Sequence, residues 1–112
     1  MEDPLRRAFQ ATRGALGCFL ADGRPGRIVH VAAGATSGGF AAEAVIGGLG
    51  ALARSTMREY GRRGIACNMV VARADTAERL GDAARSALFF ACDASSFVNG
   101  EVIRVPASWP AE

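Results

Sequence analysis

The chain has 112 residues, which is enough for one domain with a hydrophobic core. Half of the residues are apolar and 21% are charged, a composition typical of a folded globular protein and not of a disordered one. The net charge of +2 is too small to indicate a nucleic acid or an anionic membrane as partner. All 13 basic residues are arginine, so Schiff-base chemistry, a P-loop and a lysine-assisted tyrosine acid are excluded.

The cysteine and histidine content argues against a metal site. Cys18, Cys67 and Cys92 lie far apart, and His30 is the single histidine, whereas a zinc site needs about four such ligands at short spacing. The N-terminus does not resemble a targeting segment, and no apolar stretch reaches the roughly 20 residues of a membrane span. We therefore expect a cytoplasmic protein with reduced thiols, no metal and no membrane segment.

The first predicted unit is a helix followed by a strand. Asp3 and Pro4 are a capping residue and a first-turn proline. They precede an apolar face formed by Leu5, Phe9, Leu16 and Leu20. Residues 22–26 are rich in glycine and proline and favour a turn, which ends this helix. Residues 27–32 are apolar on both faces, as in a buried parallel strand.

The second predicted unit begins after a glycine-rich link at residues 34–39. The helix expected over residues 40–60 is small and apolar on nearly all sides in its first half, which predicts burial on most sides, including against another helix. Residues 61–64 close it, and residues 65–71 form a second apolar strand.

The third predicted unit begins at Thr76, which caps a helix. We expect its inner face to consist of Leu80, Ala84, Ala87, Leu88 and Ala91. After the turn dipeptide Asn99-Gly100, residues 101–105 form the last strand. Strands that alternate with helices at this spacing predict an α/β fold with a parallel sheet and right-handed crossovers.

Three segments resemble the C-terminal half of the short-chain dehydrogenase/reductase family. They are residues 9–16 with 26–31, residues 58–68, and residues 87–105, and they stand in the family's order with its gaps. The resemblance implies a truncated Rossmann-like, three-stranded parallel sheet with flanking helices, equivalent to strands five to seven of the family's seven. It also implies that residues 1–112 are a single half-domain that lacks the dinucleotide-binding half.

The positions that carry the family's chemistry are occupied by other residues. The resemblance places the tyrosine acid near Ala42 and its lysine partner at Ile46. The serine position falls at Ala32 or Ala33, and the asparagine position at Pro4. None of these side chains can donate, accept or polarise a proton. The family's Pro-Gly after the second of these strands is replaced by Ala72-Arg73, and its substrate-covering segment is almost absent.

These departures predict no catalytic, cofactor-binding or metal-binding residues and no cofactor. The leading hypothesis is a non-catalytic subunit that forms a homo-oligomer, or a hetero-oligomer with a full-length oxidoreductase relative. The open outer edge of the first strand and the apolar second helix support association. The residues predicted for the interface are Phe9, Leu16, Val45, Leu49, Leu52, Val102 and Trp109.

Two other hypotheses remain open. The chain could be a small lyase or isomerase that works without nicotinamide around His30 and Glu43, or a gene remnant that carries only the family's oxidoreductase label. The less specific interpretations are a packed, hydrogen-bonded His30 and a Glu43 placed favourably at a helix N-terminus. Trp109 is either a core residue or an interface anchor.

The first prediction concerns the cofactor. Because the phosphate loop, the ribose-binding acid and the nicotinamide contacts are all missing, the isolated chain should show no measurable binding of NAD(H) or NADP(H). Isothermal titration calorimetry tests this directly. Micromolar affinity, which corresponds to about 8 kcal/mol of binding free energy, would contradict it.

Overall fold

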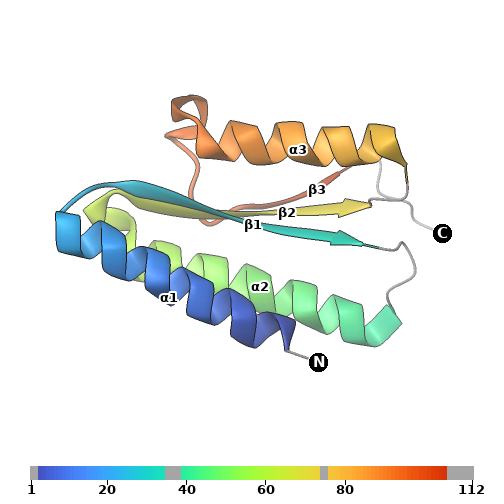
Figure 1. The fold of residues 1–112 in the computed structure, drawn as a ribbon, viewed down its shortest axis with the longest axis horizontal. Helices are drawn as coiled ribbons and strands as arrows, with labels where there is room; N and C mark the ends of the chain where they lie inside the picture. The colour runs from blue at the N-terminus through green and yellow to red at the C-terminus, as the bar shows by residue number, and fades with distance from the viewer. Residues whose placement is uncertain (1–2, 35–38, 74–75, 106–112) are drawn as a thin grey trace.

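The computed structural model describes residues 3–34, 39–73 and 76–105, which form three layers (Figure 1). The middle layer is a sheet of β1 (Gly26–Gly34), β2 (Ile65–Arg73) and β3 (Val102–Val105). One face is covered by α1 (Pro4–Asp22) and α2 (Gly39–Tyr60), and the other by α3 (Ala77–Ala91). Two short 3-10 turns, η1 (Gly61–Arg63) and η2 (Asp93–Ser95), follow α2 and α3. The predicted fold class and element order are confirmed.

The predicted helix starts are confirmed at the level of single hydrogen bonds. The Asp3 carboxylate accepts from the backbone N–H of Leu5 at 3.0 Å, and the Thr76 hydroxyl accepts from the N–H of Arg79 at 3.1 Å. Each side chain satisfies one N–H that the first helical turn leaves without a partner. The α1 helix ends at Gly23, whose φ of 66° lies in the left-handed region that glycine adopts without strain.

The centre of the fold is β2, which is paired on both edges and covered on both faces. The sheet order is β1-β2-β3 and both pairs are parallel, with Gly26 opposite Ile65 and Met69 opposite Val102. Cys67, Met69 and Val70 have no exposed surface. A strand buried in this way needs apolar residues on both faces, which explains why its sequence is apolar from Ile65 to Ala72 except at Asn68.

The expectation of right-handed crossovers is wrong for one of the two connections. Both connections move across the sheet in the same direction, from β1 to β2 and from β2 to β3. Their helices lie on opposite faces, however, so the two crossovers must have opposite hands (Figure 1). The connection through α2 is right-handed and the connection through α3 is left-handed. The statistical rule fails here because α3 packs on the face that α1 and α2 leave open.

The α2 helix is buried on one face only, so the prediction of burial on most sides is wrong for the chain alone. Leu49 and Ala53 are buried, whereas Ala44, Gly47 and Ala51 are exposed. Gly48 lies against α1, because a Cβ there would stand 2.7 Å from a methyl group of Leu5. The small residues thus serve close packing on one side of the helix and form an open surface on the other.

The inner face predicted for α3 is also wrong. Ala83 and Phe90 are its buried residues, packed against Val70, Ala72 and Val105, whereas Leu80 and Leu88 are 54% and 62% exposed. The predicted face was centred on these two leucines, because they are the largest apolar side chains among the residues assigned to it. The helix is instead rotated by roughly a quarter turn, and its apolar leucine stripe remains exposed to solvent.

Two asparagine side chains hold the turn before β3 against β2. The Asn99 side chain accepts from the N–H of Cys67 at 2.8 Å and donates to the carbonyl of Ile65 at 3.2 Å. Asn68 accepts from the N–H of Glu101 at 3.0 Å and donates to the carbonyl of Val98. The pair satisfies backbone groups that would otherwise be buried without partners, and so fixes where β3 begins.

The second prediction follows from the burial of Leu49. Leu49→Arg should lower the free energy of unfolding by more than about 3 kcal/mol, because it places a charge among Met69 and Val71. Ala51→Arg, on the exposed face of the same helix, should change it by less than about 0.5 kcal/mol. Urea unfolding followed by circular dichroism measures both. Equal stabilities for the two variants would refute this placement of Leu49.

Candidate functional site

The positions at which the resemblance places the catalytic residues carry aliphatic side chains or proline. Ala32 and Ile46 pack with the buried cluster of Leu49, Met69 and Val71. Ala42 is half-buried on α2, and Pro4 is exposed at the first position of α1. The Ala33 side chain lies outside the described residues. The described part of this region is therefore continuous with the core and presents no proton donor or acceptor at those positions.

The structure does not bring together the two residues of the new-enzyme hypothesis. Glu43 lies in the first turns of α2, and its carboxylate is paired with the Arg104 guanidinium of β3 at 3.9 Å. His30 lies in the middle of β1, with Met69 of β2 opposite. Its Nε2 is buried and has no hydrogen-bond partner. The histidine is packed as predicted, but the predicted hydrogen bond is absent at Nε2.

Burial shifts the acidity of two side chains on this sheet. Desolvation lowers the pKa of His30 below its ordinary value of 6.5 and favours the neutral imidazole. Desolvation raises the pKa of Cys67 to about 11, against a smaller opposing effect of its hydrogen bond with Thr56. The Cys67 thiol is consequently protonated at neutral pH and unsuited to nucleophilic chemistry.

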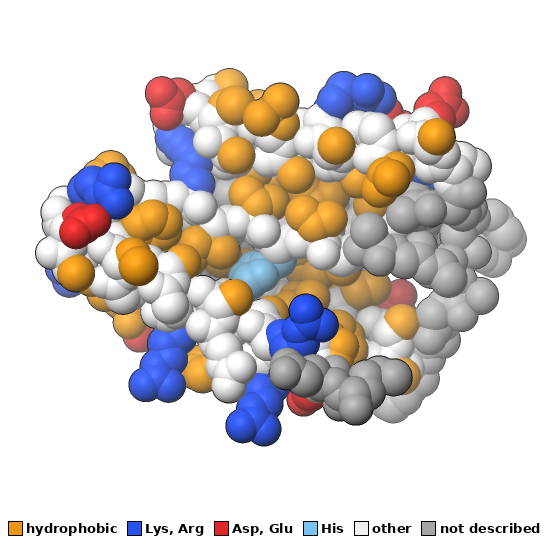
Figure 2. Space-filling view, in the orientation of Figure 1, with side chains coloured by type: hydrophobic (Ala, Val, Ile, Leu, Met, Phe, Trp, Pro, Cys, Tyr) orange, Lys and Arg blue, Asp and Glu red, His pale blue; other side chains and the backbone are white. Residues whose placement is uncertain are grey.

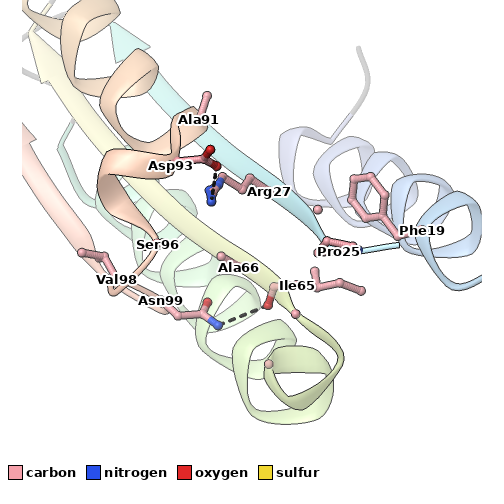
Figure 3. A pocket seen from close by; sticks show the side chains of 13 residues that line it. Phe19, Pro25, Arg27, Ile65, Ala66, Ala91, Asp93, Ser96, Val98 and Asn99 are labelled. Carbon is pink, nitrogen blue, oxygen red and sulfur yellow. Dashed lines mark hydrogen bonds and ion pairs between the residues drawn. The ribbon is translucent and has the colours of Figure 1, made fainter. Parts of the chain in front are cut away.

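A pocket of about 550 Å³ lies at the opposite end of the sheet, where the strands begin (Figure 3). Its wall includes Phe19 at the end of α1, Arg27 at the start of β1, and residues of the segment 91–99. Figure 3 shows Arg27 and Asp93 pointing toward each other across one side of it. No local pattern could have predicted this contact, because its two residues lie 66 positions apart.

Two polar side chains of the pocket, Arg27 and Asn99, are engaged in internal bonds. The Arg27 guanidinium donates to the carbonyl of Cys92 at 3.2 Å and to the Asp93 carboxylate at 3.1 Å. The Asn99 side chain is committed to the backbone of β2. These bonds tie the end of α3 and the turn before β3 to the sheet.

The predicted interface residues fall into three groups. Phe9 is 53% exposed, and Leu16 and Leu52 are half-buried. Val45 and Val102 are partly buried against the cluster that contains Leu49, and Leu49 itself is a core residue. Trp109 lies outside the described residues. The Leu49 side chain is therefore not accessible to a partner, because it already contacts the strands of its own chain.

Within the described ranges, no three His, Cys, Asp or Glu side chains are grouped so that they could hold a metal ion. Among the helices described, none has the length and apolar character needed to cross a membrane.

No protein-family model and no curated protein sequence matches the chain. Solved structures do match. They include 4-hydroxyisoleucine dehydrogenase complexed with NADH and succinate, at a TM-score of 0.79 and 19% identity over 94% of this chain. A short-chain dehydrogenase/reductase family oxidoreductase from Brucella ovis with partially ordered NAD matches at a TM-score of 0.69 and 26% identity over 87% of this chain. Gluconate 5-dehydrogenase from Burkholderia cenocepacia matches at a TM-score of 0.72 and 19% identity over 90% of this chain.

The fold is that of the short-chain dehydrogenase/reductase sheet. The chain spans about half the length of these structures, since it covers 54%, 46% and 51% of them, respectively. The resemblance read from the sequence is thus supported by the fold. The activities of those complete enzymes do not transfer with it, because half of each lies beyond the match.

The third prediction concerns the pH dependence of stability. Because the pKa of His30 is lower in the folded than in the unfolded chain, the unfolded state binds its proton first as the pH falls. The contribution of His30 to stability is therefore fully present above pH 6.5 and declines below it, until the folded-state pKa is reached. Chemical unfolding between about pH 7.5 and 5.5 should show this loss in the wild type and a smaller one in His30→Gln. Identical pH profiles for the two proteins would contradict it.

Proposed function

We propose that the chain is a non-catalytic, dehydrogenase-like subunit that associates with itself or with a full-length relative of the family. The observation that carries the proposal is the aliphatic character of the positions at which the resemblance expects catalytic groups. Ala32 and Ile46 occupy two of the positions at which the family resemblance expects catalytic groups, and both pack into the core. The fold supports kinship with the family, while the chemistry of this region supports a role without turnover.

The surface proposed for association is the outer face of the α1/α2 layer, with Phe9, Ala44, Gly47 and Ala51 as its exposed small or apolar residues. A Cβ added at Gly47 would meet nothing within 4 Å, and the same holds for Gly14 and Gly17 of α1. Glycine inside an exposed helix costs about 1 kcal/mol relative to alanine. Close approach of another helix to this face would offset that cost.

The two alternatives receive less support. An enzyme built on His30 and Glu43 would need the two groups to share a site, and Glu43 is paired with Arg104 instead. A gene remnant would not need the capped helices and the satisfied asparagine pair that this chain has.

The fourth prediction tests the association face. The wild-type protein should be a dimer or larger at tens of micromolar, alone or with a co-expressed full-length relative. Gly47→Arg should dissociate it, because the change places a charge in a dry interface. The same variant should keep the circular dichroism spectrum of the wild type, since the position faces open space. Light scattering coupled to size-exclusion chromatography measures the mass.

The matched control is Ala94→Arg, which adds the same charge at an exposed position of η2 on the other side of the sheet. It should leave the mass unchanged. A folded wild-type monomer at this concentration that also fails to co-elute with the relative would overturn the subunit proposal.

A further inference from the structure

The pocket where the strands begin has the size of a small-molecule site. Its volume of about 550 Å³ lies within the roughly 300–1,000 Å³ that such sites usually have. Phe19 and Pro25 stand on one side of it and Val98 on the other (Figure 3). Further apolar lining comes from Ile65, Ala66 and Ala91. A ligand that fills this space therefore needs an apolar body.

Two glycines allow the first wall to lie close to the strands. A Cβ at Gly26 would stand 2.4 Å from carbon atoms of the Phe19 ring, so the ring lies directly against the backbone of β1. Gly64 has a φ of 79°, which favours glycine, and a Cβ there would stand 3.1 Å from the Cβ of Pro25. Close contacts within the chain thus hold Phe19 and Pro25 in place.

The opposite wall is held by hydrogen bonds to β2. The Asn99 side chain bonds to the backbone of Cys67 and Ile65, and Asn68 donates to the carbonyl of Val98 at 3.3 Å. A wall fixed in this way keeps its position without a ligand. Binding in the pocket consequently has a small ordering cost.

One cation stands between the two walls. Among the described residues that line the pocket, Arg27 is the one basic residue and Asp93 the one acidic residue. Arg27 and Ala66 are partners in neighbouring strands, so their side chains rise from the same face of the sheet. The small Ala66 side chain leaves space beside the guanidinium of Arg27.

The Arg27 guanidinium has donors to spare and a weakly held counter-ion. It carries five N–H groups, and its described bonds use two of them, to the Cys92 carbonyl and the Asp93 carboxylate. The Arg27 side chain is 24% exposed, whereas the Asp93 side chain is fully exposed. An ion pair with a hydrated carboxylate contributes little to stability. An anion inside the pocket therefore has a weak competitor in Asp93.

The surroundings of Arg27 favour a carboxylate over a phosphate. A guanidinium binds either group through paired N–H···O bonds. A phosphate with two charges is better matched by several cations or by a row of backbone N–H groups. Here a single arginine lies between apolar walls, which suits one negative charge attached to an apolar body.

We infer that this pocket, which we call the Arg27 pocket, binds a small organic acid with one carboxylate and an aromatic or branched aliphatic body. The carboxylate pairs with Arg27 in place of Asp93, and the body lies between Phe19 and Val98. The exposed residues of α2 proposed for association do not line this pocket. The inference is therefore independent of the subunit proposal.

An NMR titration of the isotope-labelled full chain tests the inference, with hydrocinnamate as the probe and hydrocinnamide as its neutral counterpart. The acid should bind with a dissociation constant on the order of 1 mM, as expected for a ligand of about ten non-hydrogen atoms. The shifts should concentrate at Gly26, Arg27 and Ala66. Hydrocinnamide, which lacks the charge, and inorganic phosphate, which lacks the apolar body, should each bind at least about tenfold more weakly.

Three protein variants test the contact with the carboxylate. Asp93→Asn removes the internal competitor and should tighten the binding of hydrocinnamate about threefold without changing that of hydrocinnamide. Arg27→Gln should weaken the binding of hydrocinnamate at least about tenfold. Arg24→Gln is the matched control, because it removes a nearby charge from an exposed pair with Asp22 and should change the affinity by less than about twofold.

If Arg27→Gln does not fold, Asp93→Asn and the comparison of acid with amide still test the same contact. Equal affinities for acid and amide, or an Asp93→Asn variant that binds the acid no more tightly than the wild type, would overturn the inference. Shifts centred on other residues, or no saturation at about 20 mM acid, would also overturn it. Phosphate that binds as tightly as hydrocinnamate would overturn the ligand class, in favour of a simple anion contact.

Discussion

The burial of β2 is the constraint on which the rest of the structure depends. A strand with both edges paired and both faces covered must be mostly apolar, with any polar side chain hydrogen-bonded as Asn68 is, and it must meet a helix layer on each side. In this chain α2 supplies one layer and α3 the other, with Leu49 and Phe90 as their buried contacts. The opposite hands of the two crossovers follow from the same requirement, because each connection has to cover a different face of one strand.

The same arrangement leaves β1 and β3 less completely buried than β2. Within the described residues the sheet has one central strand, so β1 and β3 each pair along one edge. The two outer strands differ: β3 has four residues and includes the charged Arg104, while β1 has nine residues and is mostly apolar. The burial of β1 is accordingly incomplete although its sequence is that of a central strand. His30 shows the consequence, since its ring is packed while Nε2 has no partner.

The fold of the chain resembles that of dehydrogenases, whereas the side chains at its expected catalytic positions are aliphatic. The sheet and its helices match about half of each of several dehydrogenase structures, including enzymes solved with nicotinamide cofactors. At the matched strand ends, however, Ala32 and Ile46 extend the hydrophobic core. In the pocket at the other end, Arg27 and Asn99 form hydrogen bonds within the chain. The described residues leave the outer face of α2 exposed.

The sequence by itself determined the element order, the helix starts at Asp3 and Thr76 and the parallel sheet, because capping and apolar runs are local signals. It also identified the aliphatic residues at the expected catalytic positions. It placed Leu49 at an interface and Leu80 with Leu88 in the core, and both assignments were wrong. Only the tertiary structure decided these, because the rotation of a helix depends on what it packs against. The pairing of Arg27 with Asp93 and the contacts of α1 with α2 and β1 likewise depend on how separate segments meet, which no local pattern encodes.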